Sequence, residues 1–287
     1  THKPGVGGSN PPLATKIMKK LSMFCITSNN KHLDIIKKIG YIPVRTGEGE
    51  HPDGFFTDNT KKNISFKNPN YGEYSFHYWI WKNYLNELKE SWIGFCQYRR
   101  FWSLDQNLDV KDFEKFNRGI IKSIPEKYEK YDVILGNPMF VNQFRLSKFI
   151  KKNFKVFFRN PSLFFNKKKR NLKFHFDMMH GRGNIDRAIE LLDKHDKQSF
   201  RDYLTNSVSF NPNNMLICKS SKTLNIFYQS IFPWLEKCEN EFGFNLDGYG
   251  LKRIYGFLAE RYMPYWFQKN TNVISIPIIF KNLSDFT

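Results

Sequence analysis

Short apolar runs alternate with segments of helical periodicity along the chain. The run Lys20–Thr27 ends in polar residues, and the helical spacing of Leu33, Ile35 and Ile36 follows it, which predicts a strand, a loop and a helix. Further apolar runs predict strands at residues 41–44, 92–96, 131–135, 215–218 and 273–280. Helical periodicity predicts helices over residues 71–88, 224–241 and 251–262. This alternation is typical of an α/β fold with a mainly parallel central sheet flanked by helices.

Two segments interrupt the alternation. Residues 47–70 are rich in Gly, Asp, Asn and Pro, which predicts a long loop, and such loops are usually functional or disordered. Residues 1–19 begin with a Gly- and Pro-rich stretch that lacks the apolar core of a signal peptide. We therefore expect 1–19 to be a disordered leader or a vector-derived remnant, and 20–287 to form a single domain.

A third segment, residues 145–173, combines many lysines and arginines with phenylalanines and contains no acidic residue. This composition fits an element that associates with an anionic membrane surface. It fits equally a surface insertion whose phenylalanines pack on the core. A nucleic-acid patch is a third reading, but no RNA- or DNA-binding motif accompanies it.

The net charge of +18 favours an acidic partner, such as nucleic acid, anionic lipid or a phosphorylated small molecule. The four cysteines are widely spaced and form no CxxC pair, which argues against a disulfide framework or a zinc site and fits a reducing compartment. No apolar run reaches the ~18 residues of a membrane span.

The dibasic sequence Tyr98-Arg99-Arg100 directly follows the predicted strand 92–96. In open α/β sheets, ligands bind beyond the carboxyl ends of the strands. Two guanidinium groups at that place suit a diphosphate. The alternative is a pair of arginines that form surface ion pairs.

The motifs around this segment resemble a known family. The matching blocks are Asp58-Asn59-Thr60, Asn63-Ile64-Ser65, Tyr78-Trp79-Ile80-Trp81-Lys82-Asn83 and Ile93-Gly94-Phe95-Cys96-Gln97-Tyr98-Arg99-Arg100-Phe101. Over about residues 23–262 the chain is similar to the capsular polysaccharide and exopolysaccharide glycosyltransferases that have been catalogued as a domain of unknown function. It departs from them at Gln97, where the family has His, and in residues 148–173, which look like an insertion.

The resemblance implies a GT-A-like fold and a hexosyltransferase activity. The donor would be a nucleotide-sugar, with UDP as its carrier, and the acceptor a growing capsular, lipooligosaccharide or exopolysaccharide glycan, free or lipid-linked. Residues 20–140 would form the donor half, 141–175 a basic-aromatic insertion and 176–287 the acceptor half. We expect a cytoplasmic protein, with peripheral contact to an anionic membrane as an option and no nucleic-acid partner.

The resemblance also implies a set of donor-binding residues: Thr27, Asn59, Asn63, Lys82, Tyr98, Arg99 and Arg100. Most GT-A enzymes carry a metal-binding Asp-x-Asp motif where this chain has Gln97-Tyr98-Arg99-Arg100. Arginines can neutralise a leaving diphosphate as a metal does. We therefore expect no divalent metal and no other cofactor.

A catalytic base is harder to place. Asp247 precedes a predicted helix, as an acceptor-side base would, although a helix N-cap is an equally good reading. Glu260 is the second candidate, and its alternative is a buried ion pair with Arg261.

Candidate acceptor contacts are His180, Asn213 and Asn214, although the two asparagines also fit ordinary turn chemistry. The spacing of His175, Asp177, His180 and Asp186 suggests a metal site only weakly. Trp79 and Trp81 would point to different faces of one helix, one into the core and the other towards a sugar or nucleobase.

A second class of function is a non-catalytic basic module that binds nucleic acid or an anionic membrane surface. The charge favours it. The motifs oppose it, because an electrostatic binder has no need of these blocks in a fixed order.

Overall fold

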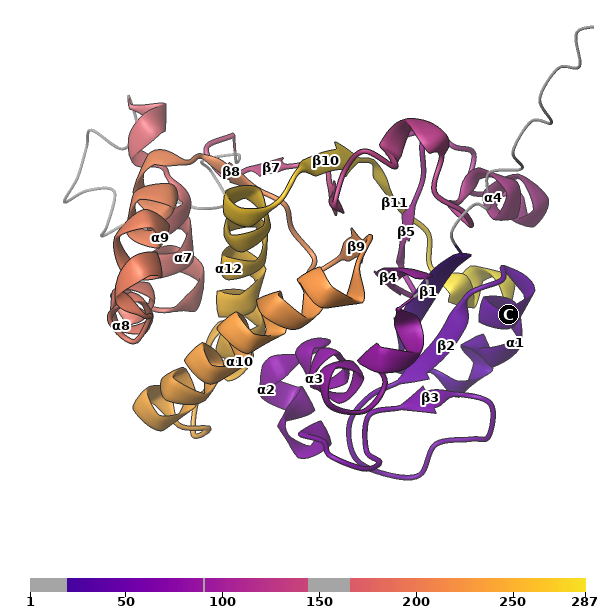
Figure 1. The fold of residues 1–287 in the computed structure, drawn as a ribbon, viewed down its shortest axis with the longest axis horizontal. Coiled ribbons are helices and arrows are strands. Elements are labelled where there is room, and N and C mark those ends of the chain that lie inside the picture. Colours follow the sequence, from indigo (N-terminus) through magenta and orange to yellow (C-terminus); the bar gives the residue numbers. More distant parts are fainter. Residues whose placement is uncertain (1–19, 90, 144–165) are drawn as a thin grey trace, which may run out of the picture.

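The computed structural model describes residues 20–89, 91–143 and 166–287. Its centre is a nine-stranded sheet with the order β10-β6-β9-β4-β1-β2-β3, and β5 and β11 pair beside β4 (Figure 1). The strands are β1 (Lys20–Thr27), β2 (Ile42–Arg45), β3 (Phe56–Thr57), β4 (Ser91–Gln97), β5 (Arg100–Trp102), β6 (Val133–Gly136), β9 (Leu216–Cys218), β10 (Val273–Ile276) and β11 (Ile278–Phe280). A separate two-stranded sheet joins β7 (Met139–Phe140) and β8 (Ser209–Phe210).

Helices surround this sheet. They are α1 (Leu33–Lys38), α2 (Asn68–Tyr71), α3 (Tyr74–Asn83), α4 (Phe113–Gly119), α7 (Leu172–His180), α8 (Asn184–Glu190), α9 (Lys194–Asn206), α10 (Ser221–Phe242), α11 (Tyr249–Lys252) and α12 (Ile254–Asn270). Short 3₁₀ helices lie at Asn30–His32, Ser65–Lys67, Leu85–Leu88, Glu126–Tyr128, Lys167–Lys169 and Leu283–Phe286. The fold is the predicted α/β class.

The sheet is mainly parallel, as predicted. The strand β1 pairs in parallel with both β2 and β4, and β6 pairs in parallel with β10. The exceptions are β9, which lies antiparallel between β4 and β6, and β5, which pairs antiparallel with both β4 and β11. The carboxyl ends of β1, β4, β6 and β10 therefore meet at the same edge of the sheet as the start of β9.

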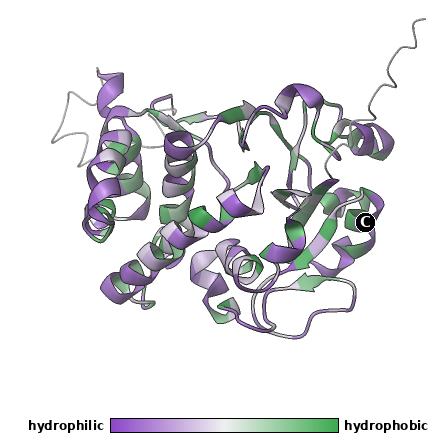
Figure 2. Ribbon diagram, in the orientation of Figure 1, coloured by the Kyte–Doolittle hydropathy of each residue, from purple (hydrophilic) through white to green (hydrophobic). Residues whose placement is uncertain are grey.

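The sheet buries both of its faces. Along β1, Phe24 and Ile26 belong to one apolar cluster with the helices α3, α10 and α12, while Met23 and Cys25 belong to a second cluster with α1 and α4. Successive side chains of a strand point to opposite faces. A strand that is buried on both faces therefore has a continuous apolar sequence, and in Figure 2 the central strands are largely hydrophobic.

Several predicted elements differ in their bounds. The strand predicted at 273–280 is divided at Pro277 into β10 and β11, because proline has no N–H for a ladder. The helix predicted at 71–88 ends at Asn83 and a 3₁₀ turn follows it. The helix predicted at 251–262 consists of the end of α11 and the beginning of α12. The predicted loop 47–70 contains β3 and ends in short helices.

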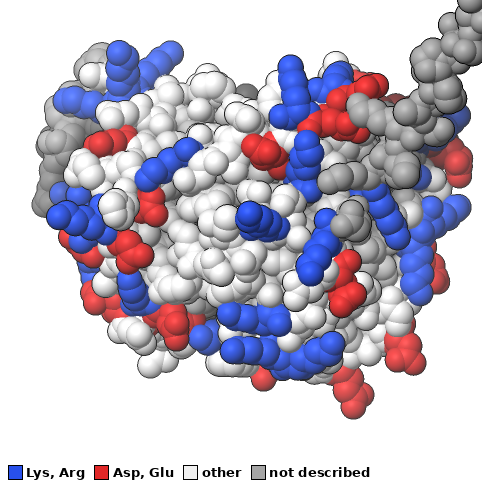
Figure 3. Space-filling model, in the orientation of Figure 1, with Lys and Arg blue, Asp and Glu red and all other residues white. Residues whose placement is uncertain are grey.

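The basic-aromatic segment falls mostly on residues 144–165, which lie outside the described residues. Of its described cations, Lys167, Lys168 and Lys169 are exposed and Arg170 is buried. In the described ranges, no helix has the length and apolar character that a membrane crossing needs. On the face seen in Figure 3, lysines and arginines are spread over several elements and alternate with acidic side chains.

Candidate functional site

The principal cavity of the site lies where β4 ends and β9 begins, and its volume is about 470 Å³. The described side chains that border it include three arginines, two carboxylates, three amides and three aromatic rings. They are Arg99, Arg100, Arg253, Glu73, Glu260, Gln97, Asn213, Asn214, Tyr98, Tyr249 and Phe257. Of the twelve residues predicted to bind or catalyse, six therefore border one cavity: Tyr98, Arg99, Arg100, Asn213, Asn214 and Glu260.

Gln97 links the groups at the floor of this cavity. Its Nε2 donates to Glu73 Oε1 (2.7 Å) and to the backbone oxygen of Asn213 (3.1 Å). Its Oε1 accepts a hydrogen bond from Arg100 Nη1 (2.9 Å). A carboxamide both donates and accepts hydrogen bonds. The uncharged Gln97 therefore orients the carboxyl group of Glu73 and the guanidinium of Arg100 at the same time.

Glu73 is a site residue whose role sequence analysis missed. It lies just before α3, with Oε2 3.9 Å from Arg253 Nη2. Burial raises the pKa of Glu73, and the neighbouring Arg253 and Arg100 oppose that shift. The combination of a raised pKa and a place in the cavity is typical of a functional carboxyl group.

The predicted catalytic Glu260 has both oxygens engaged. Oε1 accepts from the backbone N–H of Asn213 (2.7 Å), and Oε2 accepts from Arg261 Nη1 (2.7 Å). Arg261 is buried, with its guanidinium over the ring of Phe210 at 3.6 Å and a hydrogen bond to His175 Nδ1. The ion pair with Arg261 that was the alternative reading of Glu260 is therefore present, at the wall of the cavity.

The other predicted base, Asp247, is exposed in the segment between α10 and α11 and does not border the cavity. Its reading as a helix N-cap is wrong, because Gly248 occupies the N-cap of α11 and no side chain caps that helix.

Tyr98 and Arg99 form the side of the cavity nearest to the end of β1. The guanidinium of Arg99, which is exposed, lies 4.7 Å from the centre of the Tyr98 ring. Thr27 is buried behind them, and its hydroxyl is hydrogen-bonded to His32 Nδ1 (2.8 Å). Burial, and then the charge of Arg99, lower the pKa of His32.

Three predicted donor contacts lie away from this cavity. Asn59 and Asn63 are part of the loop 47–70, where Asn59 Nδ2 donates to the backbone oxygen of Gly49 and Asn63 Oδ1 accepts from Ser65. Lys82 borders a separate hollow, and its Nζ lies 3.1 Å from the centre of the Trp81 ring.

The two tryptophans follow the prediction in part. Trp79 is buried in the core and donates from Nε1 to Thr60. Trp81 borders the same hollow as Lys82, where its ring stacks on Phe232 at 5.3 Å. Neither side chain borders the principal cavity.

Asn213 and Asn214 form the turn that precedes β9, and both have left-handed backbone conformations, with φ of 79° and 51°. Asparagine tolerates this region, so the turn reading is confirmed. Asn214 Nδ2 also donates to the backbone oxygen of Gly256 (3.1 Å), which attaches the turn to α12.

His180, predicted to contact the acceptor, lies behind the wall of the cavity. Its ring stacks on Phe257 at 4.0 Å, and its Nδ1 donates to the backbone oxygen of Gly250 (3.0 Å). Burial, and then the charge of Arg261, lower the pKa of His180 to about 3. A neutral His180 thus supports the wall.

The family model described as "Domain of unknown function (DUF4422)" matches residues 25–271. The chain belongs to the DUF4422 family.

A solved structure of WbbM, a bifunctional glycosyltransferase in its apo form, is similar to this DUF4422 chain with a TM-score of 0.55 and 20% identity. The match covers 91% of this chain and 45% of that chain, so this chain spans less than half the length of WbbM. At this identity the likeness establishes a shared fold. No curated protein matches the sequence.

The four residues that suggested a metal site do not converge in this DUF4422 protein. Asp177 and Asp186 both pair with Lys173, each at 2.8 Å, while His175 faces Arg261 and His180 faces Gly250. Across the described ranges, no three His, Cys, Asp or Glu side chains are grouped so that they could hold a metal ion.

Sequence analysis also missed Arg253, Tyr249 and Phe257, which the segment 249–257 contributes to the cavity. The packing of α2 against α12 brings Glu73 to Arg253, and no local sequence signal marks that contact.

Proposed function

We propose that this DUF4422 protein is a glycosyltransferase that moves a hexose from a UDP-sugar to a growing capsular, lipooligosaccharide or exopolysaccharide glycan. The observation that carries the proposal is the grouping of Arg99, Arg100, Arg253 and Glu73 around one cavity at the carboxyl end of β4. Such a site pairs permanent positive charge for a diphosphate with a carboxyl group for an acceptor hydroxyl. The fold shared with WbbM supports the same class of activity.

The arginines would stabilise the leaving group. As the bond between the anomeric carbon and the phosphate oxygen breaks, the electron pair stays on the diphosphate, and fixed positive charges lower the energy of that state. We propose that Arg99, Arg100 and Arg253 perform this task without a divalent metal. Thr27, Asn59, Asn63 and Lys82 stay predictions as further donor contacts.

Glu73 is our candidate for the base. It would take the proton of the acceptor hydroxyl while the hydroxyl oxygen forms its bond to the anomeric carbon. Glu73 is preferred to Glu260, because within the described ranges the ion-pair partner of Glu73 Oε2 is the distant Arg253, whereas both oxygens of Glu260 accept hydrogen bonds of 2.7 Å. It is preferred to Asp247 because Asp247 does not border the cavity.

The test is a thermal-shift and donor-hydrolysis screen across UDP-, GDP- and CDP-sugars, with and without EDTA. We expect UDP to raise the melting temperature and hydrolysis of a UDP-hexose to be insensitive to EDTA. Arg100→Ala should abolish the UDP-induced shift, whereas Arg118→Ala, at an exposed arginine on α4, should leave it unchanged.

A strict requirement for Mn²⁺ or Mg²⁺ would refute the metal-independent mechanism. The absence of any nucleotide response, together with salt-dependent retention on nucleic acid or anionic lipid, would favour a basic binding module. The net charge of +18 is the observation behind that second candidate.

A further inference from the structure

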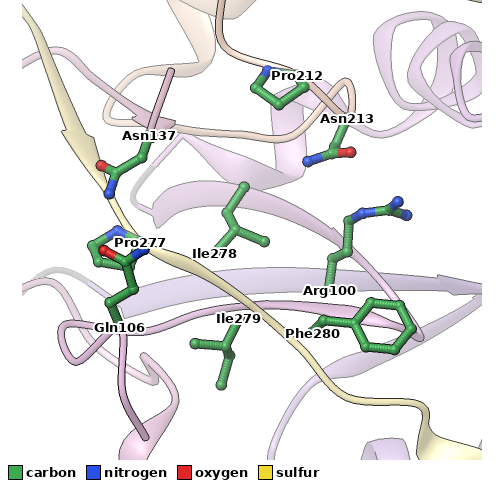
Figure 4. Close-up of a pocket in the computed structure, with 9 residues that line it drawn as sticks. All are labelled: Arg100, Gln106, Asn137, Pro212, Asn213, Pro277, Ile278, Ile279 and Phe280. Carbon is green, nitrogen blue, oxygen red and sulfur yellow. The ribbon is translucent and has the colours of Figure 1, made fainter. Parts of the chain in front are cut away.

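A second, smaller cavity of about 190 Å³ adjoins the principal one (Figure 4). The two cavities share Arg100 and Asn213. The smaller one is built where Asn137 follows β6, Gln106 follows β5, and β11 runs from Ile278 to Phe280. It therefore lies beside the guanidinium that we assign to the leaving diphosphate.

The polar groups of this small cavity are mostly uncharged. Among the described residues that border it, Arg100 is the only charged one. The side chains of Gln106 and Asn137 are exposed and make no hydrogen bond to another described residue. Each carboxamide offers two N–H donors and one oxygen acceptor, so both are free to bind a ligand.

An aromatic ring lies across the cavity from these amides. In Figure 4, Gln106 and Asn137 occupy one side of the cavity, Arg100 and Phe280 the other, and Ile278 lies between them. Phe280 is 64% exposed, which leaves a large aromatic surface in the same cavity as the polar groups. Ligand sites in proteins have this mixed character, with apolar walls and a few polar groups that fix orientation.

We propose that the small cavity binds the ring of an uncharged sugar. The hydroxyls of a sugar donate and accept as the carboxamides of Gln106 and Asn137 do, and its C–H faces can pack on Phe280 and Ile278. The inference rests on the proposed function, since the shared Arg100 sets this ring beside the diphosphate. The ring is either the hexose of the donor or the terminal sugar of the acceptor.

A uracil base would also bind to amides and an aromatic ring. It is less well matched here, because Ile278 and the ring of Pro277 offer no second flat surface for stacking. If the uracil base occupied this cavity, loss of the two amides would lower the affinity for UDP itself. That outcome is part of the test.

The experiment compares the wild-type protein with the double variant Gln106→Ala/Asn137→Ala and with Asn107→Ala. Asn107 is the adjacent exposed carboxamide that does not border the cavity. Exposed substitutions of this kind change the free energy of unfolding by less than about 0.5 kcal/mol, and a melting curve checks this. Calorimetry measures the affinity for UDP, UDP-glucose, UDP-galactose and UDP-N-acetylglucosamine, and saturation-transfer NMR with UDP present tests methyl hexosides.

We expect the double variant to bind UDP within about twofold of the wild type. If the cavity holds the donor hexose, its affinity for the best UDP-hexose falls by about tenfold or more, as expected for two lost hydrogen bonds. If it holds the acceptor sugar, saturation transfer to a methyl hexoside is lost instead. Asn107→Ala should behave as the wild type in both assays.

Equal sugar-dependent signals in the wild type and the double variant would overturn the inference, and so would a parallel loss of affinity for UDP itself. A wild-type protein that binds no UDP would instead contradict the proposed function on which the inference rests. The UDP measurement therefore separates the two failures.

Discussion

Glu73 and Glu260 border the same cavity, but their oxygens have different surroundings. Glu260 accepts hydrogen bonds from a backbone N–H and from the buried Arg261. Glu73 accepts one from Gln97 and has a longer contact with Arg253. A carboxylate whose partners are complete mainly stabilises its surroundings, whereas an incompletely paired one can still accept a proton.

We expect Glu73→Gln to lower the transfer rate by at least about 100-fold, the usual contribution of a general base. The carboxamide introduced at position 73 can still accept the hydrogen bond from Gln97, so binding of UDP should persist. Steady-state kinetics and calorimetry with UDP measure the two effects. Near-normal turnover in this variant would exclude Glu73 as the base.

The same variant should be at least as stable as the wild type at neutral pH. The folded protein raises the pKa of Glu73, so the contribution of this group is favourable at acid pH and is lost as the pH rises through the raised pKa. Glutamine does not titrate. As the pH rises from about 4.3, the pKa of an unfolded glutamate, towards neutral, the melting temperature of Glu73→Gln should therefore increase relative to that of the wild type.

Glu260→Gln is the matched comparison, and we expect the opposite effect on stability. It leaves the charge of Arg261 buried without its partner, which costs about 3–5 kcal/mol in other proteins. Urea denaturation at pH 7 measures the difference. Equal stability of Glu260→Gln and the wild type would show that the ion pair contributes nothing net.

The short helix α11 illustrates how an element holds site residues in place. A Cβ atom on Gly250 would lie 2.2 Å from the backbone oxygen of Met179 in α7, and His180 donates to the backbone oxygen of Gly250. This close contact fixes α11 against α7. Tyr249 and Arg253, at the two ends of α11, consequently reach the cavity.

Gly250→Ala should therefore separate α11 from α7. We expect the free energy of unfolding to fall by about 1–3 kcal/mol, as for other overpacked sites, and the affinity for UDP to fall with it. Denaturation and calorimetry measure both. Lys252→Ala, at an exposed position of the same helix, is the control. If Gly250→Ala changed neither the free energy of unfolding nor the affinity for UDP, the close contact between α11 and α7 would not hold the site residues in place.

Elements whose own sequence has a clear pattern of apolar and polar residues were predicted well. The strand β1 has the predicted bounds, and Arg100 lies beyond β4 in a cavity, as the strand pattern indicated. The three-residue strand β5 was not predicted, β11 was not separated from β10, and the antiparallel direction of β9 was not predicted. Direction depends on the path of the chain between strands, which the alternation of apolar and polar residues does not encode.

In the candidate site, too, only the residues that have a local sequence signal were predicted. Arg100 and Asn213 belong to a strand end and a turn, which have local signals. Glu73 and Arg253 meet only because helices that are distant in sequence pack together, and no local pattern reports that contact.

At the scale of the whole molecule, three buried histidines predict sensitivity to acid. Burial lowers the pKa values of His77, His175 and His180 to about 3 each, and the charge of Arg261 adds to the shift for the last two. The unfolded chain binds protons at these positions from about pH 6.5 downward. Their contribution to stability is thus present above that pH and is lost as the pH falls.

Below about pH 6, the three groups together should lower the free energy of unfolding by up to about 4 kcal/mol for each pH unit. Urea titrations at pH 7.5, 6.5 and 5.5 measure the slope. His77→Phe should make the slope shallower, and His195→Gln, at an exposed position, should not. A slope that is the same in all three proteins would contradict the prediction.

The position of β9 and β11 has a consequence for synthesis on the ribosome. The strands β4 and β6 leave the ribosome early, but they join into one sheet only when β9 inserts between them. The strand β11 then pairs with β5, and the backbone N–H of Leu283 bonds to Tyr98 beside the cavity. A nascent chain that ends before β11 therefore lacks a complete cavity wall, so the site would form only after β11 has left the ribosome.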